Sequence, residues 1–65
     1  MKVQDWINAT DYVDEYRIAE RDNPFSLRCF THFSAVAARG EEELDHAKII
    51  VEEDGEWIIA EIYVK

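Results

Sequence analysis

The sequence contains one cysteine, one proline, two glycines and only seven basic residues among its 65. A single cysteine excludes an internal disulfide, which suits a reducing compartment. Two isolated glycines exclude a glycine-rich phosphate-binding loop. No apolar run reaches the roughly 18 residues that a membrane-spanning helix needs, and Asp5 and Asp11 interrupt the N-terminal segment where a signal peptide would be apolar. We therefore expect a soluble cytoplasmic protein that makes no membrane contact.

The chain is long enough for one small domain. Hydrophobic residues make up 48% of it, and eight residues are aromatic, which is enough for one compact core. A domain of this size hides only about 60% of the surface that its unfolded chain exposes, so its stability is marginal. We expect residues 1–65 to form a single domain.

Positive charge is scarce, and negative charge is concentrated in the second half of the chain. The net charge is −8, with six acidic and five basic residues in 1–39 but nine acidic and two basic residues in 40–65. A field of this sign repels nucleic acids and membrane surfaces and attracts basic proteins. Direct binding of nucleic acid requires the opposite sign. The composition therefore predicts a basic protein partner and no direct contact with nucleic acid.

A β-hairpin is predicted around Asp22-Asn23-Pro24, three residues that favour turns. The flanking segments YVDEYRIAE and FSLRCFTHFSAVA alternate with the two-residue period of a strand. A helix over residues 10–21 is the alternative for the first segment, because Tyr12, Tyr16 and Ala19 also recur at helical spacing.

The segment GEEELDHAKIIVEEDG, residues 40–55, fits two structures. As a helix it gathers four apolar residues on one face: Leu44, Ala47, Ile50 and Val51. Three glutamates then occupy the first turn, where the helix dipole favours negative charge, and Gly55 ends the helix. As a strand, residues 48–53 pair with residues 56–64 across Asp54-Gly55. We favour the helix, because a glycine followed by three glutamates is an unusual beginning for a strand.

The last segment, EWIIAEIYVK, is the clearest strand. Alternate residues form one apolar face: Ile58, Ala60, Ile62 and Val64. The opposite face is also too apolar for water: Trp57, Ile59, Glu61 and Tyr63. Either the N-terminal segment, through Trp6 and Ile7, or a second copy of the chain in a homodimer would cover this second face.

These elements together predict an α+β fold. Its centre is a small three-stranded antiparallel sheet with one amphipathic helix, in the order β-β-α-β. An N-terminal arm or short helix precedes the first strand.

Residues for catalysis or metal binding are few. Cys29 and His32 have the spacing of zinc ligands, and His46 could add a third, but on one strand Cys29 and His32 point to opposite faces. The same geometry opposes a cysteine–histidine nucleophile pair. No apolar surroundings are evident that would raise the pKa of a carboxylate for acid–base chemistry. We expect no enzyme activity, no metal and no cofactor.

The carboxylates of residues 40–55 are therefore the candidate functional group. On the helix interpretation Glu41, Asp45 and Glu52 lie in a row, with Glu42 and Glu53 beside them, over about 18 Å of helix axis. Phosphates along one DNA strand repeat every ~3.4 Å. Such a row would imitate a short run of phosphates and occupy the cationic groove of a nucleic-acid-binding protein.

In size, in its acidic second half (EEELD, EEDGE) and in the lack of a catalytic motif, the chain resembles small phage-encoded anti-CRISPR proteins of the DNA-mimic type. The resemblance implies an inhibitor that acts in the cytoplasm of a bacterial host. It would bind a CRISPR effector complex, for example through a Cas effector subunit, and block access of the target DNA.

We predict a partner-binding surface of seven carboxylates and two aromatic residues: Glu41, Glu42, Asp45, Glu52, Glu53, Asp54, Glu56, Trp57 and Tyr63. The alternative function is an interaction module, antitoxin-like or a small subunit, that dimerises through its apolar sheet face. Salt distinguishes the two, because charge-driven binding weakens with ionic strength and apolar association does not.

Overall fold

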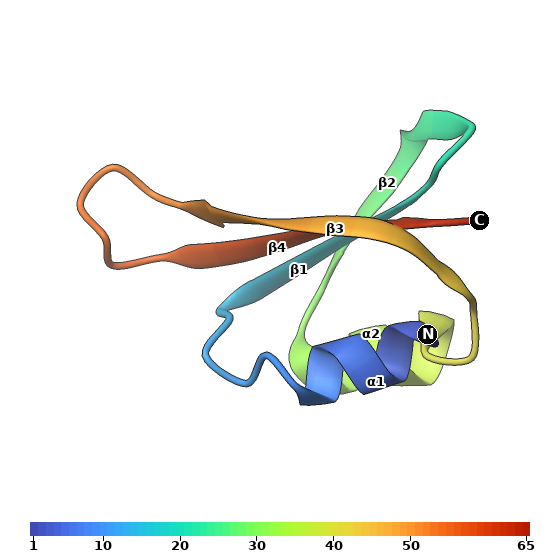
Figure 1. Cartoon of the computed structure of the whole chain (residues 1–65). Helices are drawn as coiled ribbons and strands as arrows, with labels where there is room; N and C mark the ends of the chain where they lie inside the picture. Colours follow the sequence, from blue (N-terminus) through green and yellow to red (C-terminus); the bar gives the residue numbers. More distant parts are fainter.

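The computed structural model describes all 65 residues. Two helices and four strands follow one another along the chain (Figure 1): α1 (Val3–Asn8), β1 (Glu15–Glu20), β2 (Asn23–Phe30), α2 (His32–Arg39), β3 (Leu44–Val51) and β4 (Ile58–Val64). The α+β class is confirmed. Of the two alternatives for the N-terminal segment, an arm or a short helix, the helix is present, and the predicted hairpin of β1 and β2 is present as well. Neither helix has the length and apolar character required to cross a membrane.

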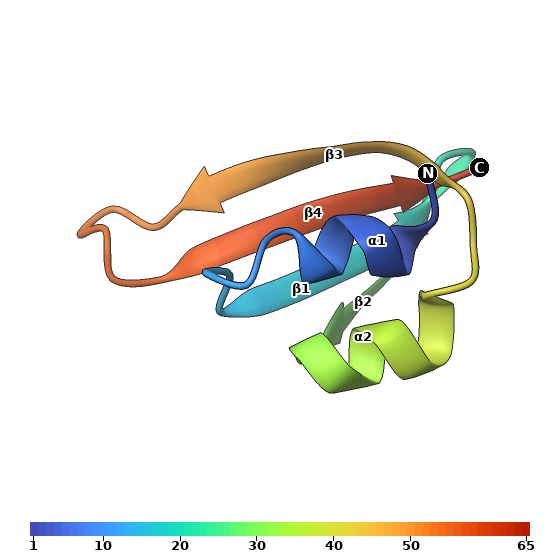
Figure 2. The same ribbon diagram turned by 60° about the horizontal axis from the view of Figure 1, so that its bottom comes forward.

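The four strands form one mixed sheet in the order β2-β1-β4-β3. The central pair, β1 and β4, is parallel, and each outer strand is antiparallel to its neighbour. Both helices lie on the same face of this sheet, as Figure 2 shows. The prediction of three antiparallel strands was therefore wrong in the number of strands and in the direction of the central pair.

The hydrophobic core lies between the helices and the sheet. Its eight members are fully buried: Val3, Ile7, Tyr16, Ile18, Ala35, Ala60, Ile62 and Val64. The predicted apolar face of β4 supplies three of them, which confirms that face as the core side. The N-terminal segment packs on this same face through Ile7. The expectation that it covers the second face of β4 was wrong, and no helix covers that face (Figures 1 and 2).

Strand β3 lies within the segment 41–53, which is therefore not a helix, contrary to the interpretation that we favoured. Each residue of Ile49–Val51 pairs with a residue of β4. A run of β-branched residues suits a strand better than a helix. The turn that contains Gly55, whose φ is +76°, returns the chain to β4. The alternative prediction, a strand that forms a hairpin with β4, is therefore correct in kind, but the pairing ends at Val51 and Ile58, so the connection is longer than the predicted two-residue turn.

The helix that precedes β3 is α2, in a segment predicted as the end of a strand. Thr31 caps it: its Oγ1 accepts a hydrogen bond from Ser34 N at 3.3 Å, while Ser34 Oγ accepts one from Thr31 N at 2.9 Å. This reciprocal capping satisfies two backbone donors at the start of the helix. Three alanines within α2 favour the helical conformation, and Arg39 lies in the last turn, where the helix dipole favours positive charge.

Candidate functional site

Most of the charged side chains lie at one or the other end of the sheet. One end, here called the terminal end, carries both chain termini, the β1–β2 turn and the α2–β3 loop (Figure 1). The other, here called the acidic end, carries the β3–β4 loop and the α1–β1 loop (Figure 1). The molecule extends 32 Å along its longest axis.

At the terminal end most of the carboxylates are in ion pairs. Glu41 lies 2.9 Å from Lys2 Nζ, and Glu43 lies 2.8 Å from the N-terminal ammonium. Glu42 pairs with Arg39, and Asp45 lies 3.2 Å from Arg21 Nη1. These cations cancel most of the local negative charge.

The ion pairs lower the pKa of three of these carboxyls. Hydrogen bonding to Lys2 lowers the pKa of Glu41, and the N-terminal ammonium does the same for the pKa of Glu43. The pKa of Asp45 is lowered first by a hydrogen bond with His46, 2.6 Å away, and then by Arg21.

At the acidic end seven carboxylates come together: Asp11, Asp14, Glu15, Glu52, Glu53, Asp54 and Glu56. The only cation among them is Arg17, whose Nε lies 2.5 Å from Glu15 Oε2. Seven acids and one base give this end a formal charge of −6 out of the total of −8. The six other carboxylates form no ion pair, so this end carries most of the field of the molecule.

Parallel pairing of β1 with β4 brings the two loops of the acidic end together. Asp14 N donates to the carbonyl of Ile58 at 2.8 Å, and Ile58 N donates to Asp14 Oδ2 at 2.8 Å. This double contact joins the start of β1 to the start of β4. Carboxylates that are about forty residues apart in sequence therefore share one end of the sheet.

The β3–β4 loop is an ordered turn. Glu52 N donates to the carbonyl of Trp57 at 2.9 Å, and Gly55 N donates to the carbonyl of Glu52 at 2.7 Å. Asp54 Oδ1 accepts from Glu56 N at 3.0 Å. Gly55 takes the positive φ that L-residues disfavour. These bonds hold four exposed carboxylates on a single tight turn.

Trp57 lies where the turn meets the sheet. Its side chain is 46% exposed, and its Nε1–H donates to Glu15 Oε1 at 3.2 Å. The pKa of Glu15 is lowered by hydrogen bonds from Arg17 and then from Trp57. Glu15 therefore stays ionised and fixes the orientation of the indole ring.

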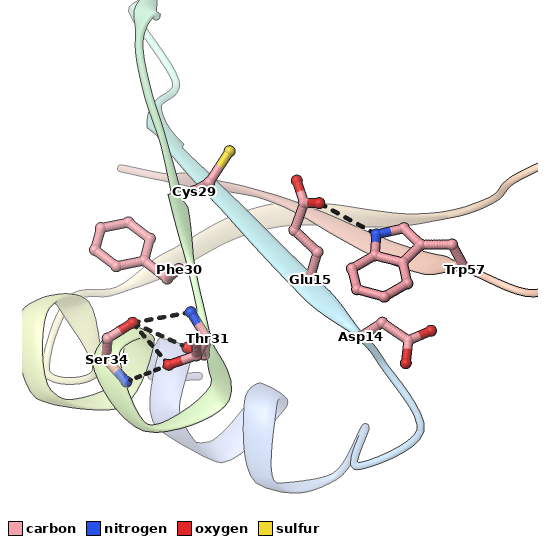
Figure 3. Close-up of a pocket in the computed structure, with 7 residues that line it drawn as sticks. All are labelled: Asp14, Glu15, Cys29, Phe30, Thr31, Ser34 and Trp57. Carbon is pink, nitrogen blue, oxygen red and sulfur yellow. Dashed lines mark hydrogen bonds between the residues drawn. The ribbon is translucent and has the colours of Figure 1, made fainter.

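A groove of about 420 Å³ opens beside Trp57 (Figure 3). It is lined by seven residues from the α1–β1 loop, β1, β2, the start of α2 and the β3–β4 loop: Asp14, Glu15, Cys29, Phe30, Thr31, Ser34 and Trp57. In Figure 3 Glu15 lies between Cys29 and Trp57, and Asp14 lies beside the indole. Two carboxylates, two aromatic rings and no cation line this groove, so it suits a positively charged group.

The structure separates the predicted partner-binding residues into two groups. Five lie together at the acidic end: Glu52, Glu53, Asp54, Glu56 and Trp57. Glu41, Glu42 and Asp45 lie at the terminal end in ion pairs, and Tyr63 stacks on His46 near the end of β4. The predicted single row of Glu41, Asp45 and Glu52 does not exist, because it required a helix where β3 is a strand.

Three charged side chains lie in a row across the uncovered face of the sheet. Arg17 of β1, Glu61 of β4 and Lys48 of β3 are aligned across adjacent strands on that face, with Lys48 Nζ 3.6 Å from Glu61 Oε1. Tyr63 donates to Glu61 at 2.6 Å. Ile59, although on this face, is only 1% exposed. An association that covered this face would have to desolvate these charges, which is costly.

The residues considered for metal or nucleophilic chemistry lie in separate environments. Cys29 is exposed on β2, whereas His32 begins α2 with its Nδ1 3.4 Å from the Tyr16 hydroxyl. His46 is on β3 beside Asp45. No three His, Cys, Asp or Glu side chains converge closely enough to hold a metal ion.

Asp11, Asp14 and Glu15 are members of the site that the sequence did not indicate. They belong to the nearly neutral first half of the chain and reach the acidic end only through the parallel β1–β4 pairing. Tyr12, which is 56% exposed, lies among these carboxylates, and tyrosine is enriched at protein interfaces.

No family model matches the chain. Curated proteins and solved structures likewise show no significant match.

Proposed function

We propose that the chain is a protein-binding inhibitor whose acidic end occupies a cationic surface of a nucleic-acid-binding protein and so keeps nucleic acid from it. The observation that carries this proposal is the formal charge of −6 at one end of the molecule. The carboxylates of the terminal end do not contribute comparably, because they are matched by nearby cations.

The shape of the acidic end supports the proposal. The β3–β4 loop projects beyond the rest of the sheet in Figure 1, so it can enter a groove that would not admit the whole domain. The arginines of a nucleic-acid site can bind carboxylates with the same bidentate geometry that they use for phosphates.

A CRISPR effector complex is the target that we propose within this class. Such a complex contacts the backbone of the DNA that it reads through positive side chains, so it presents the surface that an acidic competitor requires. The resemblance of size and charge to anti-CRISPR proteins is consistent with this choice.

The test is affinity capture on the immobilised protein from bacterial lysates, including lysates that contain CRISPR effector complexes, with and without excess duplex DNA. We expect retention of a basic nucleic-acid-binding protein that the DNA displaces. Retention that duplex DNA leaves unchanged would contradict the proposal, and so would the absence of any basic protein among those retained.

A further inference from the structure

We propose that the groove beside Trp57 receives one arginine side chain of the partner, with the guanidinium stacked on the indole and hydrogen-bonded to Asp14. This inference rests on the proposed function, because it names the group through which a basic partner is recognised. The groove has about 420 Å³ of space, which is ample for one side chain.

The charge of the groove determines the class of its ligand. Asp14 and Glu15 line it and no lysine or arginine does. Glu15 already accepts hydrogen bonds from Arg17 and from the indole of Trp57. Asp14 uses Oδ2 for the backbone N–H of Ile58 at 2.8 Å, and its Oδ1 has no protein partner. The groove therefore offers an exposed carboxylate oxygen, held in place by a backbone contact, to an incoming cation.

The indole distinguishes arginine from lysine. Trp57 is held by its hydrogen bond to Glu15 and is 46% exposed, so part of its ring is open to a ligand. Tryptophan is the best aromatic partner for a cation. A planar guanidinium can stack on the ring while its remaining N–H groups reach a carboxylate, whereas a compact ammonium cannot do both equally well.

Two peptides of equal charge, octa-arginine and octa-lysine, separate this inference from general electrostatic attraction. We expect the wild-type protein to bind octa-arginine about tenfold more tightly at moderate salt, which is the size of one partly desolvated cation–π contact. The Trp57→Leu variant should lose this preference while it keeps its affinity for octa-lysine. The Trp57→Phe variant should retain part of the preference.

Tyr12→Leu provides the matched control, because Tyr12 is also exposed at the acidic end but does not line the groove. This variant should keep the full preference for arginine. In nitrogen–proton NMR spectra the indole resonance of Trp57 should shift on addition of octa-arginine, and that of Trp6 should not.

Two results would overturn the inference and leave the proposed function standing. One is equal binding of octa-arginine and octa-lysine by the wild-type protein. The other is a preference for octa-arginine that neither Trp57 variant reduces. Failure of the wild-type protein to bind either peptide would contradict both. Thermal unfolding of each variant shows whether it is folded. If Trp57→Leu does not fold, the peptide preference of Trp57→Phe decides the test.

Discussion

The indole of Trp57 donates a hydrogen bond to Glu15 across 42 positions of sequence, and this bond joins the β3–β4 loop to the first residue of β1. It lies beside the two hydrogen bonds between Asp14 and Ile58, one backbone to backbone and one from Ile58 N to the Asp14 carboxylate. Together these contacts make one continuous surface of two loops. The charge of that surface, and the groove within it, follow from the parallel pairing of β1 with β4.

The parallel β1–β4 pair is the centre of the core, and a single methyl group there should matter. Ile62 is fully buried opposite Ile18. We expect Ile62→Val to lower the free energy of unfolding by about 1 kcal/mol, because it removes a buried methyl group and leaves a small cavity. Urea denaturation measures this directly.

The matched control is Ile49→Val on β3, where the side chain is 39% exposed. This change should cost less than about 0.5 kcal/mol. An equal loss of stability in the two variants would show that the β1–β4 interface is not the core.

The capping of α2 gives a second stability prediction. Thr31→Ala removes the side-chain oxygen that accepts from Ser34 N, and it should lower the free energy of unfolding by about 1 kcal/mol. Thr31→Ser keeps the hydroxyl and should have little effect. If both substitutions are equally harmless, residues 32–39 do not begin a helix at this position.

Acid should destabilise the protein through the ion pairs of the terminal end. The pKa values of Glu41, Glu43 and Asp45 are lower in the folded chain than their ordinary values because each carboxylate has a cationic or hydrogen-bonding partner. The unfolded chain, with carboxyl pKa values of about 4, therefore takes up protons first as the pH falls. The stabilisation is complete above that range and is lost as the pH falls through the folded-state pKa values.

We therefore expect the melting temperature to fall between about pH 6 and pH 3 as these carboxyls titrate. The triple variant Glu41→Gln, Glu43→Gln, Asp45→Asn should show a smaller fall over the same range. The same acid dependence in the variant and the wild-type protein would exclude these pairs as its source.

The sequence predicts the elements of this fold better than their arrangement. The apolar face of β4 and the β1–β2 hairpin were predicted correctly. In these segments apolar residues recur at every second position, which indicates a strand with one side buried. Helix α2 was missed because Phe33, Ala35 and Ala37 also match the strand period of the preceding segment. Its capping residues, Thr31 and Ser34, were the signal against a continuous strand.

The candidate site could be predicted only in part. The carboxylates around Gly55 were recognised from their density, and Trp57 from its place beside them. The contribution of Asp11, Asp14 and Glu15 depends on the pairing of strands distant in sequence, which no local pattern reveals. The ion pairs of Glu41 and Asp45 also depend on tertiary structure, because their partners Lys2 and Arg21 lie far away in the chain.

The central claim is that binding depends on the acidic end and not on total negative charge. It is tested most directly by two triple variants with the same change in net charge: Glu52→Lys, Glu53→Lys, Asp54→Lys at the acidic end, and Glu20→Lys, Asp22→Lys, Glu41→Lys at the terminal end. All six residues are exposed, so both variants should fold.

Dissociation constants for the captured partner are measured at low and at high salt. We expect the acidic-end variant to lose binding and the terminal-end variant to keep most of its affinity, with the steep salt dependence of the wild-type protein. Equal losses in the two variants, or binding that salt does not weaken, would contradict the account.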